Sequence, residues 1–264
     1  AVLGILKKAG APKSLEIKIT GESLFNDGIG VVVFLAILGV VKGEAEFSAG
    51  HLTELFFVEA VGGILLGLAL GGLSFWMLKQ IDDHKLEVLI TLALVTGGYA
   101  LAAKLHTSGP LAMVVAGLMI GNHGRTLAMS ASTVDHLDSF WELLDEILNA
   151  LLFLLIGFEV LVLSFQLNYL TAGLIAIPLV LACRFTAVAL PINILKPFRT
   201  FSPGVTKILT WGGLRGGISV ALALAIPASA GRDLFLVMTY TVVIFSIAVQ
   251  GMTLKNLFKP NSPQ

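Results

Sequence analysis

Charge is scarce in this chain. Of its 264 residues, 13% are charged and 56% are hydrophobic, whereas a soluble domain carries about twice that share of charged residues. The mean hydropathy of +0.91 agrees. The formal net charge is zero, which argues against a nucleic-acid partner. The composition therefore excludes an ordinary soluble domain and indicates a protein whose main partner is the lipid bilayer.

Cysteine pairs, a secretory leader and a channel filter are also missing. The single Cys183 leaves no disulfide or cysteine metal motif within one chain, and we interpret it as a packing residue. The chain begins Ala1-Val2-Leu3, without Met or a charged leader, so we expect a truncated fragment without a signal peptide. The Thr-Val-Gly-Tyr-Gly filter of a potassium channel does not occur. No pattern indicates an enzyme or a bound cofactor, and neither is expected.

Long apolar runs dominate what is present. Most are about 20 residues, long enough to cross about 30 Å of hydrocarbon as helices, although residues 109–122 are short for a span. We therefore predict an all-α, polytopic membrane protein with about eight transmembrane helices. The predicted spans are residues 21–41, 54–79, 86–104, 109–122, 139–163, 168–195, 204–228 and 233–257.

The basic residues predict the orientation of these spans, because cytoplasmic loops carry an excess of Lys and Arg. The side opposite the N-terminus carries only Lys42, Lys104 and Arg232. Both ends of the chain are therefore expected to be cytoplasmic. The side of the N-terminus carries twelve basic residues: Lys7, Lys8, Lys13, Lys18, Lys79, Lys85, Arg125, Lys196, Arg199, Lys207, Lys255 and Lys259.

The first span opens with polar residues at positions 21–30 (GESLFNDGIG). On a helix, Ser23 lies one turn before Asp27 and Glu22 one turn before Asn26, which makes two adjacent polar stripes. Polar groups at membrane depth cost several kcal/mol each unless they are paired. Their oxygens suit a small hard cation, and the Asp27 carboxylate suits a proton. The alternative is a carboxylate that serves helix packing alone.

Arg184 lies inside an apolar span and needs an acidic partner, because a guanidinium is not neutralised in practice. Glu22 is the best candidate among the few acids at similar depth. We interpret the two as a structural ion pair, with direct ion binding as the alternative. The pair would leave Asp27 as the titrating group.

Glycines mark two spans. The span 204–228 carries four glycines around Arg215, each costing up to about 1 kcal/mol relative to alanine in a helix, which predicts a discontinuous helix of the kind that lines transporter cavities. Arg215 would neutralise the negative end of a half-helix; close packing of small residues is the alternative. In the span 54–79, glycines recur every four residues and predict tight helix contact, within the chain or at a dimer face. The glycines are Gly212, Gly213, Gly216 and Gly217 in the first case, and Gly63, Gly67 and Gly71 in the second.

With these residues laid out, the chain resembles the monovalent cation:proton antiporter-1 family, which includes bacterial sodium/proton antiporters and animal sodium/proton exchangers. Residues 21–28 (GESLFNDG) and 212–219 (GGLRGGIS) carry the resemblance. Residues 140–142 (FWE) and 153–157 (FLLIG), with Asn149 and Arg184, also match in order and spacing.

The resemblance implies a role for each residue of the first motif. The Asp that matches Asp27 carries the proton and the cation in this family, and the residues that match Asn26 and Ser23 lie close to the ion. The Glu that matches Glu22 pairs with the Arg that matches Arg184. The Asn-Asp order, rather than Asp-Asp, goes in the family with electroneutral one-for-one exchange.

The resemblance also implies a fold of two inverted repeats, of which residues 1–264 would cover the second and the last helix of the first. A core domain moves against a dimerisation domain in this fold, which implies a homodimer. A family Thr-Asp-Pro motif, expected just before Ala1, is missing, so we expect that N-terminal helices of the same protein are needed to complete the ion site. Core-type helices would be 21–41, 139–163, 168–195, 204–228 and 233–257, and dimerisation helices 54–79, 86–104 and 109–122.

The leading hypothesis is a secondary transporter of the bacterial inner membrane that exchanges sodium or lithium for protons and serves pH homeostasis. The cation and the proton would compete for Asp27, and alternating access would carry one or the other across. A potassium/proton antiporter of the same mechanism is an alternative. A non-transporting membrane scaffold is the alternative from another class, but it would not need buried Asp27, Arg184 and Arg215.

Overall fold

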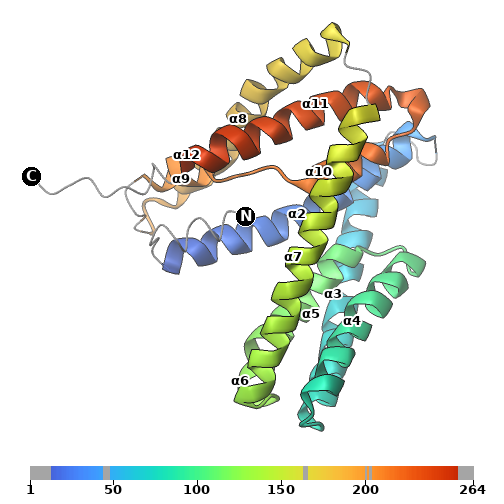
Figure 1. Ribbon diagram of the computed structural model, residues 1–264, viewed down its shortest axis with the longest axis vertical. Coiled ribbons are helices and arrows are strands. Elements are labelled where there is room, and N and C mark those ends of the chain that lie inside the picture. Colours follow the sequence, from blue (N-terminus) through green and yellow to red (C-terminus); the bar gives the residue numbers. More distant parts are fainter. Residues whose placement is uncertain (1–12, 44–47, 163–165, 200, 202–203, 255–264) are drawn as a thin grey trace, which may run out of the picture. The chain divides into compact units, whose positions relative to one another are not determined.

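The computed structural model describes residues 13–43, 48–162, 166–199, 201 and 204–254, and every regular element in these ranges is a helix (Figure 1). The long helices are α2 (Lys13–Val41), α3 (Ala49–Lys79), α4 (His84–Lys104), α7 (Ala131–Val162) and α8 (Leu167–Leu195). The shorter ones are α5 (Gly109–Met119), α6 (Arg125–Leu127), α9 (Val205–Trp211), α10 (Gly217–Leu224), α11 (Arg232–Phe245) and α12 (Met252–Leu254). The π turns η1 (Ile120–Gly124) and η3 (Ser246–Gly251) and the 3₁₀ turn η2 (Ala228–Ala230) complete the described part.

Five helices in the described ranges are long and apolar enough to cross a membrane: Ile19–Val41, Thr53–Lys79, His84–Lys104, Leu167–Leu195 and Arg232–Leu254. The prediction of an all-helical polytopic membrane protein is confirmed. The other three predicted spans fall on helices that are shorter, more charged or broken. Residues 109–122 form α5 and part of η1, 139–162 lie in α7, and 204–228 cover α9 and α10. Residue 163 and residues 255–257, the predicted ends of two spans, lie outside the described part.

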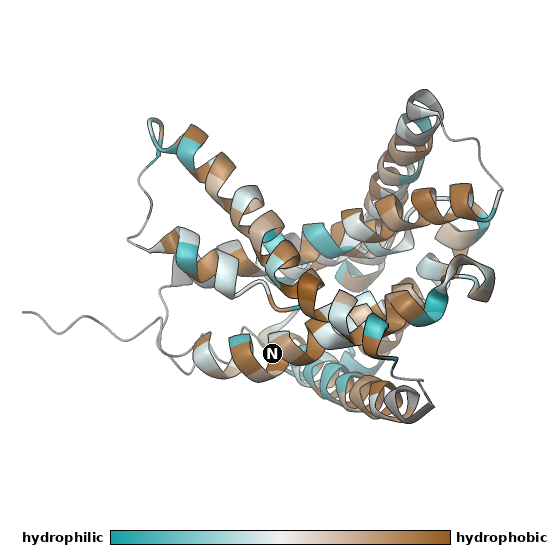
Figure 2. Ribbon diagram, turned by 90° about the horizontal axis from the view of Figure 1, so that it is seen from above, coloured by the Kyte–Doolittle hydropathy of each residue, from teal (hydrophilic) through white to brown (hydrophobic). Residues whose placement is uncertain are grey.

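Large apolar side chains are exposed along these helices, as expected for surfaces that meet lipid. On α8, for example, Ile175 is 69% exposed and Leu179 62%. Figure 2 shows apolar residues along the length of the helices. A soluble protein rarely leaves such extensive apolar surface in contact with water, so the exposure agrees with the low charge of the sequence.

The described residues divide into two compact units. Unit 1 comprises those up to Ser23 and those from Leu154 onward, and unit 2 comprises residues 24–153. The division falls within α2 and within α7, and each unit is described by itself.

Glycines bring α3 and α5 of unit 2 into close contact, which confirms the close helix contact predicted within the chain. A Cβ atom on Gly67 would lie 2.4 Å from the carbonyl oxygen of Ala112, and one on Gly63 would lie 2.6 Å from that of Ser108. No side chain fits at such distances without a shift of backbone. The second half of α2 joins this pair through Val32, which is buried together with Leu111.

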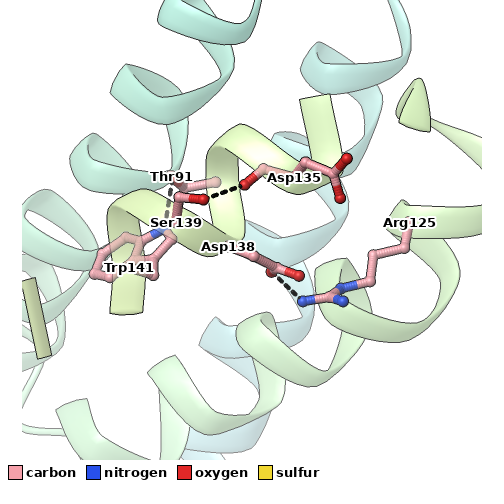
Figure 3. Close-up of polar contacts among 6 residues, drawn as sticks. All are labelled: Thr91, Arg125, Asp135, Asp138, Ser139 and Trp141. Atoms are coloured by element: carbon pink, nitrogen blue, oxygen red, sulfur yellow. Dashed lines mark hydrogen bonds and ion pairs between the residues drawn. The ribbon is translucent and has the colours of Figure 1, made fainter. Parts of the chain in front are cut away.

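Polar contacts attach α7 to its neighbours in unit 2 (Figure 3). The indole Nε1–H of Trp141 donates to the hydroxyl oxygen of Thr91 on α4 at 3.1 Å, and Arg125 of α6 forms an ion pair with Asp138 of α7. The side chain of Asp83 begins α4 by accepting hydrogen bonds from backbone N–H groups of its first turn, as N-cap residues do.

Unit 1 is built around α8 and α11. A Cβ on Gly173 of α8 would lie 2.6 Å from the hydroxyl oxygen of Thr241 on α11, so the two helices approach closely. Leu236 and Tyr240 of α11 are buried with Val220 of α10 in one apolar cluster. A second cluster packs Ile19 of α2 against Val205 of α9.

Candidate functional site

The acidic motif of the first span lies on α2, which runs without interruption through residues 13–41. Glu22 and Ser23 belong to unit 1, and Asn26 and Asp27 to unit 2. Ser23, Asn26 and Asp27 are exposed, and Glu22 is partly buried. By helix geometry, Ser23 and Asp27 share one stripe of α2, as the sequence predicts.

Gly28 explains how the Asn26–Asp27 pair is positioned in unit 2. A Cβ at this position would lie 2.7 Å from Cδ2 of Leu111 on α5. The missing side chain therefore lets α2 lie directly against α5. Asp27 is the residue immediately before this contact, so its backbone is fixed by the packing of its neighbour.

Arg184 lies against Glu22, the partner that the sequence suggested. Its Nη1 atom forms an ion pair with Oε1 of Glu22, and the two side chains are 14% and 33% exposed. Arg184 also donates from Nε and Nη2 to the backbone carbonyl of Leu209, at 3.3 and 3.1 Å. One guanidinium thus connects α8 to both α2 and α9 within unit 1.

The predicted discontinuity of the seventh span is confirmed. Helix α9 ends at Trp211 and α10 begins at Gly217, with no helix at 212–216 between them. The carbonyl of Leu209 lies in the last turn of α9, where carbonyl groups have no partner within the helix. A cation near such an end is stabilised by the helix dipole. Arg184 lies at this end of α9, and the role that the sequence suggested for Arg215 stays a prediction.

Gly213 makes room for the guanidinium of Arg184. A Cβ on Gly213 would lie 2.4 Å from Nε of Arg184 and 2.9 Å from its Cζ. This glycine is therefore needed for close approach rather than only for breaking the helix. The sequence identified Gly213 but not the side chain that it accommodates.

A small cavity, lined by apolar side chains and by four polar ones, lies beside this contact in unit 1. It measures about 10 Å³ and its lining includes Arg184, Thr210, Arg215 and Gln250. That volume is about enough for one water molecule. The hydroxyl oxygen of Thr210 is buried and has no hydrogen-bond partner among the described protein groups, so a water molecule here would satisfy it.

The structure also brings two further polar side chains to the break, Ser246 and Gln250. Ser246 is 1% exposed and Gln250 is 4% exposed. They are polar residues four apart in the apolar run 233–257. Asp27 was identified in the same way, because polar groups buried in a membrane are costly unless they are paired. The same pattern could have identified Ser246 and Gln250.

Comparison with known proteins gives a consistent result. The profile described as "Sodium/hydrogen exchanger, transmembrane" matches residues 1–259. The Na(+)/H(+) antiporter NhaP of Pseudomonas aeruginosa is 53% identical over 264 residues, which cover 98% of this chain and 62% of that protein. The antiporter NhaH of Halobacillus dabanensis is 40% identical, with 98% and 64% covered. The low-affinity antiporter NhaS1 of Synechocystis is 35% identical, with 98% and 50% covered.

This chain therefore spans between half and two-thirds of the length of these relatives. The profile nevertheless extends over nearly the whole chain, and the motifs at residues 21–28 and 212–219 had indicated the same family. The chain belongs to the transmembrane sodium/hydrogen exchanger family, a family of transporters rather than enzymes.

Proposed function

We propose that the protein exchanges sodium or lithium for protons across a bacterial inner membrane, with both ends of this chain on the cytoplasmic side. The names of its relatives support monovalent cation and proton exchange. The observation that carries the proposal is the Asp27 carboxylate within the apolar helix segment Ile19–Val41. An acid at membrane depth marks an ion or proton pathway by default.

Competition for Asp27 accounts for exchange. The deprotonated carboxylate binds one cation, and the protonated carboxyl releases it; Asn26 and Ser23 add oxygen ligands without adding charge. Because either one proton or one monovalent cation neutralises a single carboxylate, each half-cycle carries the same charge. The exchange is then electroneutral, and clamping the membrane potential would leave its rate unchanged.

Glu22 and Arg184 act as the structural part of the site in this proposal. Their ion pair ties α2 to α8, and the Arg184 contact with Leu209 extends the tie to the broken helix. Helices α3, α4 and α5 form the dimerisation domain of a homodimer, and the remaining spans form the core that moves during alternating access. N-terminal helices of the same protein complete the ion site. No resident cofactor takes part.

The test is cation-driven proton movement in proteoliposomes that contain the protein expressed from its complete reading frame. Asp27→Asn removes the titrating group and should abolish exchange with sodium and lithium. Asp83→Asn, in the connector before α4, is the matched control and should keep the wild-type rate. Exchange that persists in Asp27→Asn would refute the mechanism. Exchange that responds to potassium alone would instead assign the protein to potassium/proton antiport.

A further inference from the structure

The break between α9 and α10 removes a specific backbone hydrogen bond. In a continuous α-helix, the N–H of Arg215 would donate to the carbonyl of Trp211, four residues earlier. In the structure, the N–H of Arg215 donates instead to Oγ of Ser246 at 2.9 Å, and the carbonyl of Trp211 accepts from Nε2 of Gln250 at 3.1 Å. Each half of the missing bond therefore has a side-chain partner.

Both partners come from a single turn, the π turn η3 (Ser246–Gly251) at the end of α11. A π turn holds one more residue than an α turn and occurs frequently at functional sites. Residues four apart in it lie on the same side of the helix, so Ser246 and Gln250 reach the break together. The indole Nε1–H of Trp211 also donates to the hydroxyl of Thr253 at 2.8 Å, which fixes the end of α9 to the next turn, α12.

The burial of Ser246 and Gln250 makes their hydrogen bonds to the break important for stability. Ser246 and Gln250 are almost completely enclosed, and a backbone N–H or carbonyl buried without a partner is costly. If both side chains were apolar, the best remaining partners of the N–H of Arg215 and the carbonyl of Trp211 would be each other. Forming that bond would restore one of the backbone hydrogen bonds of a continuous helix across the break.

We propose that Ser246 and Gln250 are positioning residues for exchange, which keep the helix of residues 205–224 broken by replacing the Arg215–Trp211 backbone bond. The proposal rests on the exchange function proposed above. The π turn holds α9 and α10 in the geometry that transport requires, and neither side chain needs to touch the transported ion. The chemistry involved is hydrogen bonding alone.

The first test compares transport by single variants in proteoliposomes, using the protein expressed from its complete reading frame. Ser246→Ala removes the acceptor, and Gln250→Met keeps the side-chain length without a donor. We expect the maximal rate to fall at least tenfold while the cation concentration at half-maximal rate changes less than twofold. Ser139→Ala, whose exposed hydroxyl donates to the carbonyl of Asp135 within α7, and Gln80→Met, at the exposed C-cap position just after α3, are matched controls that should transport normally. Wild-type rates in Ser246→Ala and Gln250→Met would overturn the proposal.

The second test needs no transport. Each single variant leaves one backbone group without its partner, so each should lower the thermal unfolding midpoint of the detergent-solubilised protein. In the double variant the two orphaned groups can bond to each other, so its midpoint should fall by less than the sum of the single effects, as expected for coupled sites. Transport should still be lost. Additive falls in the midpoint would overturn the proposal.

The third test uses Gln250→Glu. A protonated carboxyl can donate to the carbonyl of Trp211, as the amide does, whereas a carboxylate cannot. Exchange by this variant, relative to wild type, should therefore fall as the pH rises, and a wild-type pH profile would contradict the proposal. If the wild-type protein itself shows no exchange, the proposed function fails, and the thermal measurement on the double variant still decides the role of the π turn.

Discussion

Replacing Gly213 by alanine is the sharpest perturbation of the Arg184 contact. The new Cβ would lie 2.4 Å from Nε of Arg184, about 1 Å inside the 3.4 Å at which ordinary contact begins. Either the guanidinium or the segment 212–216 must move. A shift of that size takes at least one N–H of Arg184 beyond hydrogen-bond reach of the Leu209 carbonyl. The ion pair with Glu22 is disturbed by the same movement.

The magnitude follows from what is lost. A hydrogen bond to a charged group contributes about 1.5–3 kcal/mol. An ion pair contributes between about 1 kcal/mol at the surface and 3–5 kcal/mol when one partner of a buried pair is removed. Because Arg184 and Glu22 are partly exposed and the pair is displaced rather than deleted, we expect a loss of roughly 3 kcal/mol. That is about a hundredfold in the folding equilibrium.

The assay is reversible unfolding in mixed detergent micelles, read as a free energy of unfolding. Gly97→Ala on α4 is the control, because a Cβ there would meet nothing within 4 Å. Alanine is also more favourable than glycine in a helix interior by about 1 kcal/mol. The two substitutions should therefore change stability in opposite directions. Stability of Gly213→Ala equal to wild type would refute the close-approach argument.

Three further predictions concern unit 2. Gly67→Ala should lower the unfolding midpoint, because its Cβ would lie 2.4 Å from the backbone oxygen of Ala112; an unchanged midpoint would contradict the packing of α3 on α5. Trp141→Phe should cost about 1 kcal/mol in the free energy of unfolding through loss of its hydrogen bond to Thr91. Thr91→Val, which also removes the bond from the Thr91 hydroxyl to the Val88 carbonyl, should cost less in the Trp141→Phe background than in the wild-type protein. Backbone N–H donors hold the pKa of the exposed Asp83 carboxyl below its usual range. Its stabilisation of the start of α4 should therefore be complete above the pKa of an unfolded Asp and disappear as the pH falls through the lowered value; Asp83→Asn, measured by unfolding against pH, should remove this acid-side dependence.

The helices were largely predictable, because hydropathy and glycine content are local properties of the sequence that favour or interrupt a membrane-spanning helix. The apolar runs placed the long helices α3, α4 and α8 to within a few residues of their ends. The start of α2 was less predictable, since it begins at Lys13, before the apolar run. The span 204–228 was predicted as one interrupted helix, and the structure shows half-helices of 7 and 8 residues. The π turn in the last span leaves no local signal in composition.

The candidate site was predictable in its acidic and basic residues. Arg184 and Glu22 were expected to pair because a charge at membrane depth needs an opposite charge, and the structure places them together. Asp27 was identified because a carboxylate at membrane depth is also costly unless it is paired, and its role in exchange stays a prediction. The carbonyl of Leu209 was not predictable, because every residue has a backbone carbonyl and only the break leaves this one without a helical partner.

By itself the sequence determined that this protein is helical, that it spans a membrane and where one helix is interrupted. These properties follow from free energies that depend on each residue and its near neighbours: transfer into lipid, helix propensity and the cost of glycine. Only the tertiary structure decided how the interruption is stabilised. The bonds from Arg184, Ser246 and Gln250 join residues 25 to 39 positions apart, and such partners depend on which helices pack together, which local propensity does not specify.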